Sequence, residues 1–231
     1  MPLPTLNTPK YQTIVPSTGK EIEYRPFLVK EEKILLIAQE SKSNKEILRA
    51  MKDIISACTF GAVNADDCTM YDIEYLFLQL RAKSVGEIAN VQIRCSKCNE
   101  YVPVEINLED VQVVFPKKKI ETKIQLTDSV GLTLKPVTFK VAQTIKTDND
   151  ITGAIASVID TIYDENNVYT LADATAKEID EFINSLNRKQ LEKIQEFIEN
   201  QPQLQHMVEF ECNKCGHKNK HVLKGIQSFF A

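Results

Sequence analysis

The sequence predicts an α+β protein in which two distant cysteine pairs build one zinc-ribbon-like antiparallel sheet. The first observation is the pairs themselves, Cys95 with Cys98 and Cys212 with Cys215, each with Cys-x-x-Cys spacing. The second is the alternation of apolar and polar residues on both sides of each pair, which is typical of strands. The third is helical spacing of apolar residues elsewhere. We therefore expect an N-terminal β-hairpin and helical unit, the ribbon sheet, and an inserted helical segment.

The expected boundaries follow these changes of pattern along the 231 residues. An N-terminal arm, the hairpin and helices occupy 1–87, the discontinuous zinc-ribbon sheet combines 88–136 with 205–231, and the helical insertion fills 137–204. A chain of this length can bury a substantial core. The length allows one large domain or two small ones.

The N-terminal part contains a hairpin and three helical patterns. Two strand-like segments, 11–15 and 21–27, flank a turn at Pro16–Lys20. A helix is expected near 30–39, and two more follow capping-box spacings. These spacings are Ser43 with Glu46 and Thr69 with Asp72.

The middle of the chain predicts strands and then helices. Residues 91–134 alternate like strands, and Lys117–Lys119 after Pro116 indicate a solvated turn. One helical face is expected from Ile151 through Ile155 and Val158 to Ile159 and Ile162. Thr175 with Glu178 forms another capping-box spacing, and Asn187 is expected to cap the helix after it.

The two cysteine pairs predict a closed structural zinc site. Two short Cys-x-x-Cys turns that face each other present four thiolates in a tetrahedral arrangement that suits zinc. Asn99 and Gly216 follow the second cysteine of each pair, and both residue types tolerate the positive φ that such a turn requires. Lys97 and Lys214 can offset part of the thiolate charge. We expect one zinc ion per chain, bound by Cys95, Cys98, Cys212 and Cys215.

Two other uses of these cysteines remain open at this point. Cys212 and Cys215 could form a local Cys₂His₂ site with His217 and His221 and leave the first pair free. A redox pair is the other alternative, but it normally lies at a helix N-terminus, and neither pair precedes a helical pattern. Of the remaining cysteines, Cys58 falls on an apolar helical face, where a buried small apolar residue is expected.

Composition and motifs exclude several function classes. The net charge of −4 does not favour non-specific binding to phosphate backbones. No apolar run reaches the ~18 residues of a membrane span, and the N-terminus lacks the apolar core of a signal peptide, so we expect neither a membrane partner nor secretion. No P-loop, dinucleotide, nucleophile-elbow or zinc-protease motif occurs. We therefore expect no enzyme and no small-molecule substrate.

A nucleic-acid-binding or transcription-associated zinc ribbon is the alternative function. Basic residues are locally enriched around the two cysteine pairs, but few aromatic residues accompany them as platforms for base stacking. With the acidic total charge, this makes nucleic acid an unexpected partner. The basic residues are Arg94, Lys97, Lys214, Lys218, Lys220 and Lys224.

The block Tyr24-Arg25-Pro26-Phe27-Leu28-Val29-Lys30-Glu31-Glu32-Lys33 carries a family resemblance. Together with the two cysteine pairs, it resembles the baseplate hub subunit and hub assembly family of T-even-like contractile-tailed bacteriophages. The resemblance implies a non-enzymatic structural or assembly protein of the central hub, with other baseplate or tail proteins as partners. It also implies location in the virion tail baseplate, or in the host cytoplasm during assembly.

The same block is a candidate interaction site. Arg and aromatic residues are enriched where proteins anchor each other, so a protruding Arg25 and Phe27 would suit a protein partner. The alternative is that Phe27 and Leu28 pack in the core between hairpin and helix. The candidate residues are Tyr24, Arg25, Pro26, Phe27, Leu28 and Lys30.

Overall fold

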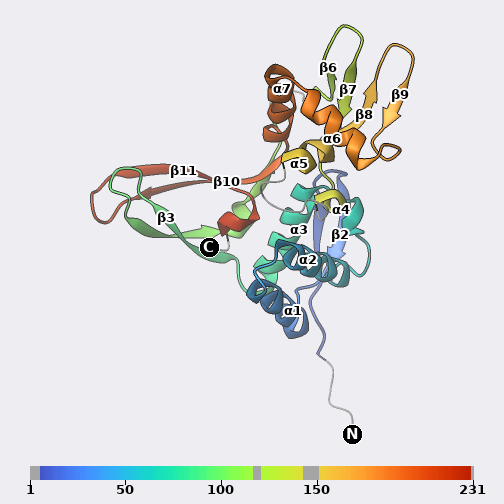
Figure 1. Ribbon diagram of the computed structural model, residues 1–231. Helices are drawn as coiled ribbons and strands as arrows, with labels where there is room; N and C mark the ends of the chain where they lie inside the picture. The colour runs from blue at the N-terminus through green and yellow to red at the C-terminus, as the bar shows by residue number, and fades with distance from the viewer. Residues whose placement is uncertain (1–5, 117–120, 143–150, 230–231) are drawn as a thin grey trace. The chain divides into compact units, whose positions relative to one another are not determined.

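The computed structural model describes residues 6–116, 121–142 and 151–229. Figure 1 shows a mixed α+β chain, as the sequence predicts. The chain divides into two compact units. Unit 1 combines Met1–Val114 with Gln203–Ala231, and unit 2 is Phe115–Pro202.

The N-terminal part of unit 1 contains the expected hairpin and helices. Strand β1 pairs antiparallel with β2, and α1 packs against α2, which in turn packs against α3. The elements are β1 (Tyr11–Val15), β2 (Lys20–Tyr24), α1 (Val29–Glu40), α2 (Asn44–Cys58), η1 (Ala65–Asp67) and α3 (Met70–Ser84).

A buried carboxylate connects the hairpin to α3. Thr69 and Asp72 form the predicted capping box at the start of this helix. Asp72 is fully buried, and its carboxylate accepts the Ser17 N–H at 2.8 Å and the Thr69 N–H at 3.0 Å. Ser43 is the N-cap residue of α2 but makes no side-chain cap hydrogen bond. The capping box expected from Ser43 with Glu46 is therefore not formed.

The rest of unit 1 contains two sheets, each with one cysteine pair, so the single zinc-ribbon-like sheet expected from both pairs is not confirmed. Strand β3 pairs with β4, while β10 lies between β11 and β5. Leu78 and Ala82 of α3 share an apolar core with inward residues of β3 and β10. The elements are β3 (Ile88–Arg94), β4 (Tyr101–Asn107), η2 (Leu108–Asp110), β5 (Gln112–Val114), β10 (Gln203–Glu211), β11 (Lys218–Lys224) and η3 (Ile226–Phe229).

Strand β5, which precedes unit 2 in the sequence, pairs with β10, which follows it. Val114 is the register partner of Gln203, and Val113 is the partner of Leu204. The last residue before unit 2 and the first residue after it are therefore neighbours in one antiparallel sheet.

Unit 2 contains a four-stranded antiparallel sheet and four helices among its described residues. The strand order is β6-β7-β8-β9, and apolar residues of α5, α6 and α7 complete the core on this sheet. The elements are β6 (Lys123–Gln125), β7 (Gly131–Leu134), α4 (Phe139–Ala142), α5 (Ile151–Val158), β8 (Ile159–Tyr163), β9 (Val168–Thr170), α6 (Ala176–Ser185) and α7 (Arg188–Glu199). The predicted caps of α6 at Thr175 and of α7 at Asn187 are confirmed.

The structure corrects the expected extent of the insertion and its helical character. Residues 123–134 were assigned to the ribbon sheet (88–136 with 205–231), but β6 and β7 pair within unit 2, with β7 next to β8. The expected insertion, 137–204, therefore begins earlier and contains a sheet. The helix from Ile151 ends at Val158, because β-branched Ile159 and Ile162 pair with β7 instead of continuing the helical face. The turn expected at Lys117–Lys119 lies outside the described residues.

Candidate metal centre

Each cysteine pair occupies the turn of a β-hairpin. In the first turn, the Cys95 N–H donates to the Glu100 carbonyl at 2.8 Å and the Asn99 N–H donates to the Cys95 carbonyl at 2.9 Å. The second turn repeats both bonds at 2.9 Å, with Cys212 and Gly216 as donors. Asn99 has φ of 59° and Gly216 has φ of 64°. The positive φ predicted at both positions is therefore confirmed.

The four sulfur atoms converge on one point. All four lie within 4.8 Å of one another. Cys95 Sγ lies 3.7 Å from Cys215 Sγ, and Cys98 Sγ lies 3.6 Å from Cys212 Sγ, so each close pair joins the two turns. A disulfide would require about 2.05 Å. Four sulfurs placed ~2.3 Å from one tetrahedral zinc ion are roughly 3.8 Å apart, which agrees with the two close separations, 3.7 Å and 3.6 Å.

The environment of Cys95 favours its thiolate, whereas that of Cys215 opposes a further negative charge. Burial raises the pKa of the Cys95 thiol, but N–H groups of Cys98, Lys97 and Asn219 overcome this effect and lower the pKa to about 6. At Cys215, a hydrogen bond from the His217 N–H lowers the pKa, while burial and the neighbouring sulfurs raise it to about 12. A divalent cation bound between the sulfurs would compensate the repulsion between neighbouring thiolates.

Asn219 joins the two turns, and sequence reasoning missed it. Its Oδ1 accepts from both the N–H and the hydroxyl of Ser96 at 2.9 Å. Its Nδ2 lies 3.0 Å from the His217 carbonyl and 3.5 Å from Cys95 Sγ. The residue is only 4% exposed. The available signal was an amide at an inward position of the alternating strand β11, next to a cysteine pair.

The charged residues around the turns are partly neutralised by acidic partners. Lys214 of the second turn forms an ion pair with Glu100 of the first hairpin, and Lys220 pairs with Glu209 at 2.8 Å. Arg94 lies over the ring of Tyr101, 4.8 Å from its centroid. Lys214 thus connects the two hairpins. These contacts do not favour the nucleic-acid alternative, which requires basic groups that are free to meet phosphates.

The structure gives no support to the other uses of the cysteines. Among the described residues, one cluster of candidate metal ligands occurs, and it contains the four cysteines without His217 or His221. The ring of His221 instead stacks on Phe210 with 5.7 Å between centroids. Both turns connect strands, so no helix N-terminus is present to lower a thiol pKa for redox chemistry. Cys58 is fully buried, as expected for a small apolar residue.

The candidate interaction block lies mostly inside unit 1. Tyr24, Arg25 and Phe27 are buried and Pro26 is half-buried, whereas Leu28 and Lys30 are exposed. Arg25 and Phe27 therefore do not protrude. The alternative of a core position agrees with the burial of Phe27 but not with the exposure of Leu28.

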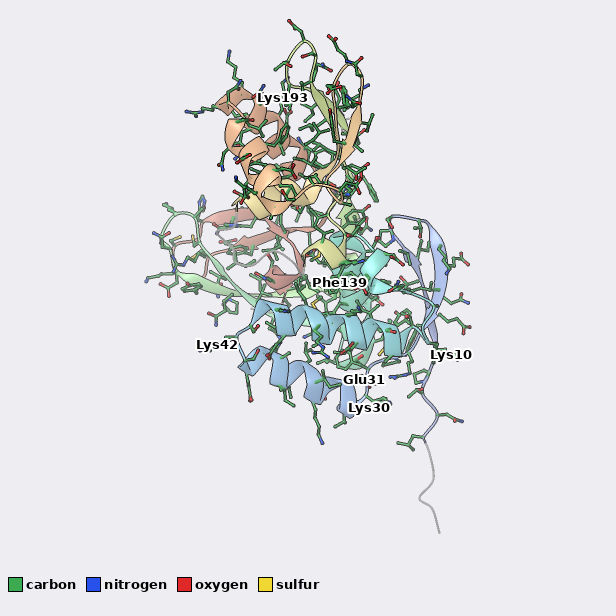
Figure 2. All side chains as sticks on the ribbon, turned by 45° about the vertical axis from the view of Figure 1, so that its right-hand side comes forward. Lys10, Lys30, Glu31, Lys42, Phe139 and Lys193 are labelled. Carbon is green, nitrogen blue, oxygen red and sulfur yellow. The ribbon has the colours of Figure 1, made fainter. Side chains whose placement is uncertain are left out.

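A buried ion pair fixes the end of this block. Arg25 Nη2 lies 2.9 Å from Glu31 Oε1, and Glu31 Oε2 accepts the Leu28 N–H at 2.8 Å. Lys30 approaches the same carboxylate from solvent at 3.4 Å. Figure 2 labels Lys30 and Glu31 at this position. The block thus determines how the chain enters α1, while its role in binding a partner stays a prediction.

Comparison with known proteins identifies the family. The family described as "T4 bacteriophage base plate protein" matches residues 8–231. The chain is similar to "Baseplate hub assembly protein gp26" of Enterobacteria phage T4, with 26% identity over 222 residues, 96% of this chain and 98% of that protein. None of the solved structures matches. No helix in the described part of the chain is long and apolar enough to cross a membrane. The resemblance to a baseplate hub family is confirmed: the chain belongs to the T4 bacteriophage base plate protein family.

Proposed function

We propose that the chain is a structural or assembly protein of the central hub of a phage tail baseplate. It acts through contacts with other baseplate or tail proteins and performs no catalytic step. The similarity to a hub assembly protein along almost the full length of both chains carries this proposal. The absence of a recognised catalytic motif in the sequence is consistent with it.

The same proposal includes one structural zinc ion in a zinc ribbon. Cys95, Cys98, Cys212 and Cys215 would bind it, and the sulfur separations support four-coordinate binding. All four ligands come from the protein, so no position is left for water or substrate. Bound zinc would hold the two hairpin turns together and would supply no chemistry. Asn219 would orient Cys95 and the first turn around the ion.

Replacing Asn219 with alanine should weaken zinc binding without removing a ligand. The substitution deletes the contacts to Ser96, His217 and the Cys95 sulfur, so the two turns lose their direct amide connection. Loss of such an outer-shell partner typically lowers metal affinity by ~10- to 100-fold. Competition with a chromophoric chelator measures the affinity. Asn90→Ala, at an exposed position of β3, is the matched control, and equal affinities for both variants would contradict the role of Asn219.

The hub assignment is tested by recovery of the tagged protein from infected cells. Other baseplate or tail proteins should co-purify, and nuclease treatment should not release them. Recovery of nucleic acid instead, with salt-dependent affinity, would favour the alternative function. Mass spectrometry of purified virions then distinguishes the two roles within the proposal. A resident subunit is present in the particle, whereas an assembly factor is found only with intermediates.

A further inference from the structure

Helix α1 lies at the surface of unit 1 and exposes large apolar side chains there. It packs on α2, and it buries Glu31 and Ala38. Leu28 at its N-cap and four residues of the helix are between 40% and 67% exposed. A helix that is apolar on several sides is ordinarily covered on several sides. The four exposed residues of the helix are Val29, Ile34, Leu36 and Ile37.

The exposed side of α1 combines apolar residues with the charges of Lys33 and Glu40, and exposed Glu32 lies at its edge. With 3.6 residues per turn, Val29 and Leu36 lie on one line along the helix, opposite buried Glu31 and Ala38, and Ile37 lies beside them. Lys33 and Glu40 share this side. We call the set Val29, Lys33, Leu36, Ile37 and Glu40 the outer face of α1. Among the described residues, neither Lys33 nor Glu40 has an ion-pair partner.

We propose that the outer face of α1 binds the same face of a second copy of this chain, with the two α1 helices antiparallel. The charge pattern selects this occupant. In the register that places Leu36 against the partner's Ile37, Lys33 lies opposite the partner's Glu40. The twofold symmetry of an isologous contact repeats both pairings. The apolar centre and the two flanking ion pairs thus form in a single register.

Other features of α1 suit this packing. The Arg25–Glu31 ion pair fixes the start of the helix, so little ordering is required when it binds. Antiparallel helices also place opposite dipole ends side by side. The 12-residue helix is about 18 Å long. Two such helices bury less surface area than the interface of an obligate dimer. We therefore expect a reversible dimer with a micromolar dissociation constant. The proposal does not depend on zinc or on the hub assignment.

Analytical ultracentrifugation of the full-length protein over a wide concentration range tests the dimer. The wild type should change from monomer to dimer, and Leu36→Glu should raise the dissociation constant at least ~10-fold, as expected for a central apolar contact. Val168→Asp is the matched control, because Val168 is also strongly exposed but lies on β9. Circular dichroism confirms that each variant is folded. A wild type that stays monomeric at hundreds of micromolar would overturn the proposal.

Charge reversal tests the register. Lys33→Glu and Glu40→Lys alone should each weaken dimerisation several-fold, because each places like charges opposite one another twice. An equimolar mixture of the two variants should recover dimerisation, because the mixed dimer restores both opposite-charge pairs. The double variant K33E/E40K should also dimerise. Lys189→Glu, exposed on α7, is the control. A dimer that these reversals do not affect, or that mixing does not restore, would show that another surface is used.

Discussion

A Cys212→Ser variant should purify without zinc, whereas the wild type should contain about one ion per chain, and the melting temperature of the variant should be lower by about 10 °C or more. Cys212 is buried, and its sulfur lies 3.6 Å from Cys98 Sγ in the other turn. A serine cannot replace this thiolate as a ligand, so the turns would separate. Elemental analysis and thermal unfolding with and without chelator measure the two effects.

The loss should concentrate at the cysteine ends of the hairpins. The apolar cluster there is small, with Val102 as its buried member beside Cys95 and Cys212, so a bound metal would account for most of the local stability. Amide hydrogen exchange should therefore rise around the turns more than in α3. Cys68→Ser, at a half-buried position outside the cluster, should retain about one zinc per chain. A zinc-free wild type that melts at the same temperature with chelator would contradict the zinc proposal.

Glu31→Gln should destabilise unit 1 by about 3–5 kcal/mol. The side chains of Arg25 and Glu31 are only 11% and 5% exposed, so removal of the carboxylate charge leaves a buried guanidinium without its counter-ion. The Leu28 N–H loses a charged acceptor as well. Chemical denaturation measures the change. Glu32→Gln, the exposed neighbour, should stay within ~0.5 kcal/mol of the wild type.

A double variant separates the charge effect from packing. Arg25→Met with Glu31→Leu removes both charges, and it should recover much of the stability lost in Glu31→Gln, because no buried charge remains unpaired. If Glu31→Gln costs no more than Glu32→Gln, the ion pair does not stabilise the entry to α1.

The contribution of Glu31 should also depend on pH. Burial raises the pKa of this carboxyl, but the hydrogen bonds from Arg25 and from the Leu28 N–H outweigh burial and hold the pKa below its ordinary value of 4.5. The carboxylate therefore binds its proton less readily in the folded protein than in the unfolded chain. Its stabilisation is complete above pH 4.5 and is lost as the pH falls through the folded-state pKa. The difference between wild type and Glu31→Gln should shrink in acid.

Local chemistry in the sequence was sufficient for several elements. Thr69, Thr175 and Asn187 satisfy helix N-termini within three residues, so their spacing predicts them, although the same spacing at Ser43 forms no cap hydrogen bond. The cysteine turns are local in the same sense, because Asn99 and Gly216 supply the backbone conformation that each turn requires. A structural zinc site needs four ligands, and each turn supplies two, so the simplest complete site combines both turns. Their convergence could therefore be expected before the path between them was known.

The features that sequence reasoning missed depend on contacts between distant residues. Ile159 and Ile162 fit a helical face as well as a strand, and only pairing with β7 decides between the two. Arg25 suggested a surface anchor, but its burial depends on Glu31 in the first turn of α1. Asn219 similarly acquires its role from Ser96 in a different hairpin. Polar residues at apolar positions were the available signal, and their partners were not visible in the sequence.

Because Val114 pairs with Gln203, unit 2 is an insertion between two neighbouring strands of unit 1. The chain leaves and re-enters unit 1 at adjacent positions of one antiparallel sheet, so a two- to five-residue hairpin turn could replace residues 115–202 without moving either strand. The loop that a bound metal would close through unit 1 is correspondingly short, because β5 pairs with β10 and this brings the two cysteine hairpins into one region.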